Sequence, residues 1–242
     1  MSVEERSNSA EIFQQWNLYD RIIQLNYMKH REMAEGVART AQIAGAACRV
    51  LDLGCGDGRM AVMGLEGTAC ESYHGIDLSG EAIAAAKKNL VLGDATITFT
   101  QGDLVIAGSL LSDPWRHDRV KPVNTLLASY SLHHLADDVV QNLLSALSSA
   151  MDRPGWFCWI DLCTYPDEAR STYLNRFYRD ELTTWTELTP ADVSAVIAHM
   201  DSSDFPLSES HRLDVAARAG FALHRPLYRD DFYAAHLFEL SR

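Results

Sequence analysis

Continuous apolar segments alternate with amphipathic ones along the chain, and the two patterns predict different elements of secondary structure. Seven segments have the length and apolar character of strands, and they cover residues 49–53, 73–77, 95–100, 123–128, 156–162, 222–228 and 232–240. Three intervening segments have helical spacing, at residues 60–69, 81–90 and 137–150. Strands that alternate with helices predict an α/β fold, in which a mainly parallel sheet has helices on both faces.

Two further stretches predict helices outside this alternation. Residues 11–44 place apolar and aromatic side chains at helical spacing, which predicts an N-terminal helical cover. Residues 166–210 are helical in pattern and rich in aromatic residues, so we expect a lid, although a plain pair of surface helices has the same composition. The length of 242 residues suits one domain. Its expected parts are the two covers, a core at 45–165 and a strand pair at 211–242.

A glycine loop follows the first predicted strand. The sequence there is Asp52-Leu-Gly54-Cys-Gly56-Asp-Gly58, and a helix is expected to begin at position 59 or 60. Glycine lacks Cβ, so the chain can turn sharply and bring bare backbone N–H groups against a ligand. A dinucleotide fingerprint would need its third glycine at position 59, which is Arg59. The spacing instead resembles motif I of the class I S-adenosylmethionine-dependent methyltransferases, in which this loop holds the methionine part of the cofactor.

Acidic residues at the ends of the next two strands agree with this resemblance. Asp77 lies 19 residues after Gly58, where a carboxylate can accept both hydroxyls of a ribose, and Ser79 is placed to cap the following helix. Asp103 follows the third strand, and in the family an acidic residue at this point accepts from the adenine amine. Each of these carboxylates alone would most often be a turn or cap residue. Their occurrence in register with the glycine loop favours the cofactor.

The resemblance implies a Rossmann-like sheet of seven strands in the order 3-2-1-4-5-7-6, with the last strand antiparallel. It also implies S-adenosylmethionine as the cofactor. Small-molecule members of the family often carry an N-terminal cover over that cofactor, so aromatic residues of 11–44, and His30 with them, become candidates to line the pocket, although single aromatics are more often core. The expected cofactor-binding residues are Asp52, Gly54, Cys55, Gly56, Gly58, Asp77, Leu78, Asp103, Leu104, Ser129, Tyr130, Tyr19 and Tyr27.

Candidate catalytic residues follow the fourth and fifth strands. The run Ser131-Leu-His133-His134-Leu resembles the loop after the fourth strand in small-molecule methyltransferases of the quinone-biosynthesis type. It does not resemble Asn/Asp-Pro-Pro-Tyr, which counts against methylation of adenine or of a glutamine amide. His133 or His134 can supply a base if the acceptor is protonated, and Asp161 can orient the substrate or the histidine. Alternatively, a loop histidine is a hydrogen-bonded spectator and Asp161 caps a helix.

The expected substrate is a small molecule with a nucleophilic O, N or S atom. It would lie between the loop after the fourth strand and the cover at 161–211. The residues expected to contact it are Tyr130, Tyr165, Tyr178, Trp185 and His199. The abundance of aromatic residues in 156–185 favours an aromatic or otherwise flat acceptor, although an aromatic lid can also serve only to exclude water.

Composition excludes several classes of partner. The formal net charge of −12 argues against binding to nucleic acid. The sequence has neither an apolar run of about 18 residues nor an N-terminal targeting pattern, so we expect a cytoplasmic protein that does not enter a membrane. Five scattered cysteines suggest reduced thiols. His133, His134, Asp161 and His199 lack the spacing of a metal motif, so no metal site is expected. Composition does not predict the oligomeric state.

Two alternatives to a methyltransferase differ in class. A nicotinamide-dependent oxidoreductase would share the fold and the ribose-binding carboxylate, but the glycine spacing disfavours it. A sensor or partner subunit that binds S-adenosylmethionine without catalysis would share every cofactor residue and lack an organised acceptor pocket. The aromatic and histidine residues at 165–211 favour a pocket. The sequence leaves the sensor open.

Overall fold

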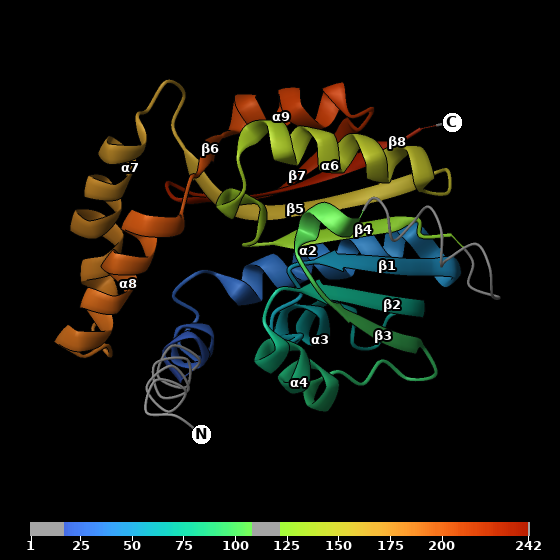
Figure 1. Cartoon of the computed structure of the whole chain (residues 1–242), viewed down its shortest axis with the longest axis horizontal. Helices are drawn as coiled ribbons and strands as arrows, with labels where there is room; N and C mark the ends of the chain where they lie inside the picture. The colour runs from blue at the N-terminus through green and yellow to red at the C-terminus, as the bar shows by residue number, and fades with distance from the viewer. Residues whose placement is uncertain (1–16, 108–121, 242) are drawn as a thin grey trace.

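A twisted β-sheet runs through the centre of the computed structural model, which describes residues 17–107 and 122–241 (Figure 1). Its strands are β1 (Cys48–Leu53), β2 (Cys70–Asp77), β3 (Thr96–Gln101), β4 (Thr125–Ser129), β5 (Gly155–Thr164), β6 (Leu207–Ser208), β7 (Ala222–Arg229) and β8 (Tyr233–Leu240). The order is β3-β2-β1-β4-β5-β8-β7, and β6 pairs with β5 off this path. Strands β1 to β5 pair in parallel, whereas β8 is antiparallel to both β5 and β7.

The predicted α/β class is confirmed, and the strand count needs a correction. The sheet has eight strands instead of seven, because Leu207 and Ser208 pair with Cys163 and Thr164 as an extra two-residue strand. Such a short strand has no detectable alternation in sequence. When β6 is set aside, the remaining strands follow the expected order, with the last strand antiparallel between the fifth and sixth.

Helices cover both faces of the sheet. After a helical stretch at 17–24 come α2 (His30–Ala44), α3 (Arg59–Leu65), α4 (Gly80–Asn89), α6 (Asp137–Ala150), α7 (Arg170–Arg176), α8 (Pro190–Ser203) and α9 (Glu209–Arg218). Helices α2 and α3 bury their apolar side chains in one hydrophobic core, and α6 and α9 bury theirs in another on the opposite face. Successive residues of β5 alternate between the two cores: Cys158 and Ile160 join the first, while Phe157 and Trp159 join the second.

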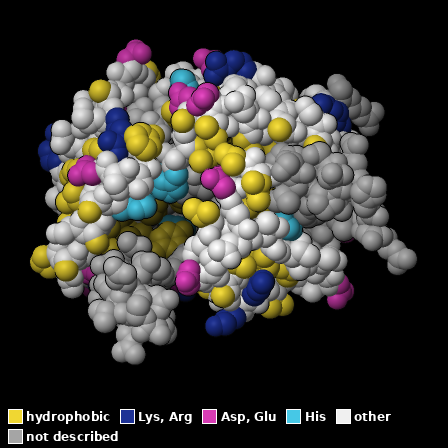
Figure 2. All heavy atoms as spheres, in the orientation of Figure 1, with side chains coloured by type: hydrophobic (Ala, Val, Ile, Leu, Met, Phe, Trp, Pro, Cys, Tyr) yellow, Lys and Arg dark blue, Asp and Glu magenta, His cyan; other side chains and the backbone are white. Residues whose placement is uncertain are grey.

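Helices α7 and α8 form the cover at one end of the sheet, at the left of Figure 1. Helix α8 begins with a capping box in which Thr189 and Asp192 bond each other's backbone N–H groups, and Pro190 occupies its first turn. Figure 2 shows a hollow with hydrophobic side chains inside it on the same side of the molecule, and histidine side chains gather at its rim. Among residues 17–107 and 122–241, no helix has the length and apolarity needed to cross a bilayer.

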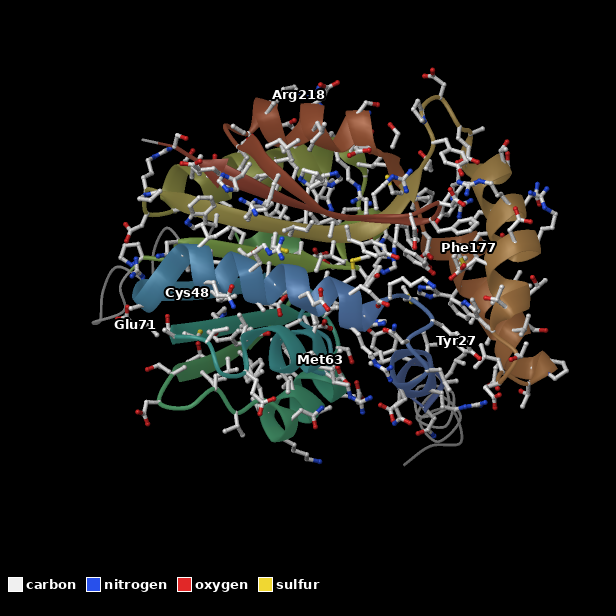
Figure 3. The ribbon with its side chains drawn as sticks, turned by 180° about the vertical axis from the view of Figure 1, so that it is seen from behind. Tyr27, Cys48, Met63, Glu71, Phe177 and Arg218 are labelled. Carbon is white, nitrogen blue, oxygen red and sulfur yellow. The ribbon has the colours of Figure 1, made fainter. Side chains whose placement is uncertain are left out.

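The aromatic residues of the cover pack against one another and against the N-terminal region. Trp185 stacks on Tyr27 with ring centroids 5.0 Å apart and also meets the edge of Phe177. Figure 3 shows Tyr27 and Phe177 on the same side of the molecule, where the N-terminal helices approach the cover. Phe177 in turn contacts Phe232 and Tyr233. These rings are part of the core, so their abundance does not by itself indicate an aromatic substrate.

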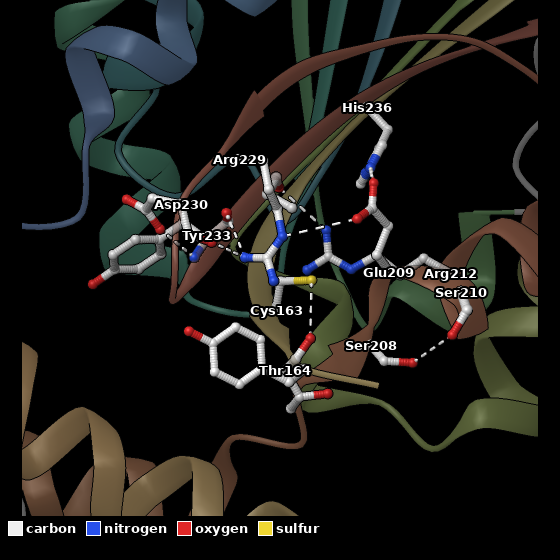
Figure 4. Close-up of polar contacts among 12 residues, drawn as sticks. Cys163, Thr164, Ser208, Glu209, Ser210, Arg212, Arg229, Asp230, Tyr233 and His236 are labelled. Carbon is white, nitrogen blue, oxygen red and sulfur yellow. Dashed lines mark hydrogen bonds and ion pairs between the residues drawn. The ribbon is translucent and has the colours of Figure 1, made fainter. Parts of the chain in front are cut away.

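Helix α9 was not predicted and lies inside the segment expected to hold only a strand pair. It is rich in charged residues, and Arg212 is 1% exposed. The Arg212 guanidinium donates to the carbonyls of Leu162 and Ala234, and Glu209 lies 2.8 Å from Nε2 of His236 (Figure 4). A prediction that places every arginine at the surface misses α9, because the buried face of this helix includes Arg212, whose charged guanidinium is hydrogen-bonded.

Candidate active site

The glycine loop joins β1 to α3 in the conformation that its sequence predicts. Gly54, Gly56 and Gly58 all have positive φ, at 76°, 53° and 77°. A Cβ on Gly54 would lie 2.5 Å from the Cβ of Ser131, so this position excludes a side chain on grounds of space as well as of backbone angle. A Cβ on Gly56 would meet nothing within 4 Å, so the backbone here faces open space that a ligand can approach.

Asp77 lies at the end of β2, next to this loop, and its carboxylate is held in place by backbone donors. The Gly56 N–H donates to Asp77 Oδ2 at 2.8 Å, and the Ser79 N–H donates to Oδ1 at 2.9 Å. Ser79 also caps α4 through its side chain, as predicted. Each carboxylate oxygen can accept a further bond. A preorganised carboxylate of this kind suits the two hydroxyls of a ribose.

Asp52 is buried at 2% exposure beneath the loop. The Tyr73 hydroxyl donates to Asp52 Oδ2 at 2.6 Å, whereas Oδ1 has no hydrogen-bond partner among the described residues. Burial, partly offset by the Tyr73 hydrogen bond and reinforced by the charge of Asp77, raises the pKa of Asp52 to about 7. An unpartnered buried carboxyl oxygen is costly, so it marks a place where a ligand donor or cation would fit.

The remaining cofactor candidates lie around the carboxyl ends of β1 to β4. Leu78 is 71% exposed beside Asp77. Asp103 is exposed and caps the short 3₁₀ turn Leu104–Ile106 by accepting from the Val105 N–H at 3.1 Å. Cys55 is buried, while Leu104 and Ser129 are half-buried. The fold thus brings the glycine loop, Asp77 and the β3 end to one edge of the sheet.

The two N-terminal tyrosines have different surroundings. Burial and the nearby carboxylates of Asp57 and Asp77 raise the pKa of Tyr19, which places its side chain beside the cofactor loop. Tyr27 instead stacks on Trp185, and its hydroxyl accepts from the Glu187 N–H at 2.9 Å. Tyr27 therefore joins the N-terminal region to the cover, and these contacts favour a structural role over contact with the cofactor.

His30 is the buried group whose surroundings point most clearly to a ligand. It is 2% exposed, and neither ring nitrogen has a hydrogen-bond partner among the described residues. Its ring lies 5.3 Å from that of Tyr130 and 6.2 Å from that of Tyr19. Burial and the charge of Arg59 lower the pKa of His30 to about 4, so its imidazole is neutral at pH 7. A neutral, unpartnered imidazole can accept a proton or a hydrogen bond.

Tyr130 follows β4 with a φ of 54°, which is uncommon for a residue with a side chain. Its hydroxyl donates to the carbonyl of Met28, and its ring meets the edge of Tyr233. The unusual backbone angle and this bond together turn the ring toward the start of α2. Tyr130 therefore fixes one wall of the space around His30.

The two histidines predicted as bases lie in a cluster with acidic partners. His133 is buried, with Nδ1 paired to Asp161 Oδ1 and Nε2 lying 3.4 Å from Asp204 Oδ1. Burial alone lowers the pKa of His133, but these two carboxylates outweigh it and raise the pKa to about 10. His134 is more exposed, and its Nδ1 lies 3.0 Å from the Ser203 carbonyl. With both nitrogens of His133 facing carboxylates, the geometry does not favour it as a base.

Asp161 lies at 2% exposure and is fully engaged by its neighbours. Besides His133, it accepts from the Trp159 indole N–H at 3.2 Å, and it lies close enough to Arg212 to feel its charge. Burial raises the pKa of Asp161, but the adjacent imidazolium outweighs this effect and lowers it. Asp161 therefore contacts His133, and its role in orienting that histidine stays a prediction.

The structure does not gather the other predicted substrate residues into one pocket. Tyr165 is 39% exposed, bonds Asp231 at 2.6 Å and lies beneath the Arg176 guanidinium. Tyr178 bonds Asp201 at 2.8 Å within the cover. Trp185 is a core residue, and His199 Nε2 lies 3.3 Å from Asp204 Oδ1. Of the substrate candidates, Tyr130 alone lies against His30 in the part of the chain that the structure describes.

Known methyltransferases resemble this chain in sequence and in fold. Residues 50–155 match the family described as a methyltransferase domain. An uncharacterized methyltransferase of Bacillus cytotoxicus is 24% identical over 161 residues, which make up 65% of this chain and 69% of that protein. The structure of magnesium protoporphyrin IX methyltransferase from Synechocystis with bound S-adenosylhomocysteine matches with a TM-score of 0.58 at 17% identity, and the match covers 93% of each chain.

The structure of the mitomycin 7-O-methyltransferase matches with a TM-score of 0.56 at 16% identity and covers 89% of this chain. The chain spans about half the length of that protein and of human N-acetylserotonin methyltransferase. The matching domain and the fold support the predicted class I S-adenosylmethionine-dependent methyltransferase. The narrower resemblance to the quinone-biosynthesis type stays a prediction, as does the cytoplasmic location.

Proposed function

We propose that the protein transfers a methyl group from S-adenosylmethionine to an O, N or S atom of a small-molecule acceptor. The observation that carries this proposal is a preformed cofactor loop with a buried, unpartnered imidazole nearby. In the loop, the Gly56 N–H donates to Asp77 and the Gly56 backbone faces open space. The imidazole is that of His30. A protein that only bound the cofactor would have no use for a costly unpaired group of this kind.

The residues of the sheet edge fit the cofactor. Gly54 and Gly56 would face its methionine part, Asp77 its ribose and Asp103 its adenine. The unpartnered Oδ1 of Asp52 suits the positive charge of the methionine part. When bound, the cofactor supplies a methyl group already activated by a sulfonium, so the protein's tasks are to align the acceptor and to exclude water.

His30 is the residue we assign to the acceptor. One nitrogen of its neutral ring carries a proton, and the other can accept a proton or a hydrogen bond from an acceptor O–H, N–H or S–H group. Tyr130 and Tyr19 flank its ring and limit the directions from which an acceptor can approach. Because the pKa of His30 is lowered to about 4, the imidazole accepts without first losing a proton at neutral pH.

The N-terminal helix at 17–24 closes this region from outside. Asp20 forms an ion pair with Arg59 at the start of α3, and Arg21 forms one with Asp192 of α8 at 2.8 Å. The helix therefore contacts both the cofactor loop and the cover. A wall attached at both sides is suited to exclude water during methyl transfer.

The test is to incubate the protein with methyl-labelled S-adenosylmethionine and a metabolite extract, and to identify labelled products by mass spectrometry. We expect label in one or a few small molecules. Label confined to protein or nucleic acid would refute a small-molecule acceptor. Tight cofactor binding with no transfer to any acceptor would support the sensor instead.

Two variants separate cofactor binding from acceptor chemistry. Asp77→Ala should weaken cofactor binding by about 2–4 kcal/mol in calorimetry, because it removes two charge-assisted hydrogen bonds. His30→Gln should leave cofactor affinity within about twofold and lower kcat by about 10²–10⁴-fold, the usual contribution of an acid or base. His224→Gln is the matched control, because His224 lies on β7 beside Glu239, away from the loop. Equal losses in the His30 and His224 variants would remove His30 from the mechanism.

A further inference from the structure

We propose that His133, His134 and Asp204 form a binding site for a divalent transition metal of the zinc type. The three residues come from two distant parts of the chain. His133 and His134 follow β4, whereas Asp204 directly follows α8. The proposed site goes beyond methyl transfer and does not depend on it.

The geometry around Asp204 Oδ1 carries this inference. Three imidazole nitrogens approach that one oxygen: His199 Nε2 at 3.3 Å, His133 Nε2 at 3.4 Å and His134 Nδ1 at 3.5 Å. Asp204 is 4% exposed, and Oδ1 makes no hydrogen bond to any of the described residues. Three nitrogens therefore converge on one buried oxygen at distances longer than an ordinary hydrogen bond.

These separations are those of ligands around a metal. Zinc binds histidine nitrogen and carboxylate oxygen at about 2.0–2.2 Å, so the edges of a zinc tetrahedron measure about 3.3–3.5 Å. An N–H···O hydrogen bond is shorter, at about 2.7–3.2 Å. Ligand atoms of His133, His134 and Asp204 all lie within 4.8 Å of one another, so a single ion can bind all three. His199 also approaches this oxygen but lies outside that group, so it stands next to the site and does not bind the ion.

Asp161 supplies the outer contact that such a site needs. It binds the Nδ1 side of His133, and this leaves Nε2 directed at Asp204. A carboxylate that fixes the ring of a metal-binding histidine in this way is a regular feature of zinc sites. In the metal-bound form the ion takes the place of the proton between His133 and Asp204. His134 Nδ1 exchanges its contact with the Ser203 carbonyl for the metal.

The ligand set selects the kind of metal. Two imidazoles and one carboxylate, with a further position open to water, suit zinc and the neighbouring transition ions, whereas calcium and magnesium prefer oxygen ligands. Figure 2 shows histidine side chains gathered at the rim of the hollow, on the side where α7 and α8 lie. A bound ion would fasten the end of α8 to the loop after β4. Its expected effect is to hold the cover against the sheet.

The test uses the full chain, stripped with a chelator and then titrated with Zn²⁺ alone by calorimetry, with Co²⁺ as a spectroscopic probe. We expect one Zn²⁺ per chain with submicromolar affinity, a rise in Tm, and the visible absorption bands of tetrahedral Co²⁺. His134→Ala should weaken binding at least tenfold and keep the fold, since the side chain is 38% exposed. Asp161→Asn should weaken binding by about 10–100-fold.

His211→Ala is the matched control, because His211 pairs with Asp137 and lies outside the cluster. It should bind the metal as the unchanged protein does. Circular dichroism establishes that each variant is folded. The proposal is overturned if the unchanged protein shows no saturable binding of Zn²⁺ or Co²⁺. It is equally overturned if His134→Ala binds as tightly as His211→Ala, since the metal would then lie elsewhere, for example on a thiol.

Discussion

Replacement of Asp52 by Asn should weaken cofactor binding and at the same time stabilise the free protein at high pH. The two effects have one cause. Asp52 is buried with Oδ1 unpartnered, so ionising it in the absence of a ligand is unfavourable, and its pKa rises to about 7. A cationic ligand beside that oxygen would reverse the balance and favour the ionised form.

The expected pH dependence of binding follows from that pKa. If the cofactor binds only to ionised Asp52, each protein molecule must lose one proton below pH 7 before it binds. The affinity then falls as the pH is lowered, by up to tenfold per unit, which amounts to about 30-fold between pH 8 and pH 5.5. Asp52→Asn removes this dependence.

The change in folding stability with pH has the opposite sign to that of a salt-bridged carboxylate. The folded pKa of about 7 lies above the ordinary value of 3.8, so Asp52 costs nothing below about pH 4 and destabilises the free protein progressively up to pH 7. From pH 5 to pH 8 the unchanged protein should lose about 2–3 kcal/mol of unfolding free energy relative to Asp52→Asn. The two proteins should also differ in unfolding free energy by an amount that does not vary with pH, because the amide NH2 group introduced by Asp52→Asn has no acceptor for its hydrogen bonds.

The assay is calorimetric titration of both proteins with S-adenosylhomocysteine from pH 5.5 to pH 8, together with urea unfolding of the free proteins. Comparing the two proteins cancels the titration of the ligand itself. The reasoning is refuted if both proteins show the same pH slope of affinity. It also fails if the difference in unfolding free energy between them does not change with pH.

Two further predictions concern the loop and the cover. Gly54→Ala should lower the unfolding free energy by about 2 kcal/mol or more and abolish cofactor binding, because the added Cβ would clash with Ser131. Gly67 has a similar φ and open space around it, so Gly67→Ala should lower the unfolding free energy less. Equal shifts in Tm for the two variants would contradict the clash. Arg21→Ala should change Tm little, since its ion pair with Asp192 is partly exposed, but should speed amide hydrogen exchange in 17–24. Unchanged exchange there would show that the pair does not hold the helix.

The parts of the site that could be predicted from sequence are those whose partners lie close along the chain. Gly56 and Asp77 are 21 residues apart, one in the loop just after β1 and the other at the end of the neighbouring parallel strand β2. The apolar segments and the glycines fix where each strand ends, so the two residues come to the same edge whatever the rest of the chain does. The strand order followed from the family resemblance, and the two-residue β6 escaped because it has no pattern.

The parts that could not be predicted depend on contacts between distant segments. Asp204 lies 71 positions after His133 in a short polar stretch and carries no signal of its own. His30 resembles any apolar-face histidine until Tyr130, 100 residues away, is placed beside it. Trp185 was assigned to the substrate because aromatic residues suit pockets, but it is used for packing on Tyr27. Composition can single out such residues as candidates for a site, but it does not show which residues they contact in the fold.

Contacts between the N-terminal region and the cover indicate that the two form one lid. Arg21 pairs with Asp192, Lys29 lies 3.7 Å from Glu181, and Tyr27 stacks on Trp185, so three residues between positions 21 and 29 tie the N-terminal region to the segment 166–210.

On the side of the sheet, residues 17–24 are held to α3 by the ion pair between Asp20 and Arg59, next to the glycine loop. The interface with the cover includes the stack of Tyr27 on Trp185, whereas the Asp20–Arg59 ion pair is partly exposed and contributes about 0–1 kcal/mol. We therefore predict that the Asp20–Arg59 contact opens before the ring stack when the lid moves.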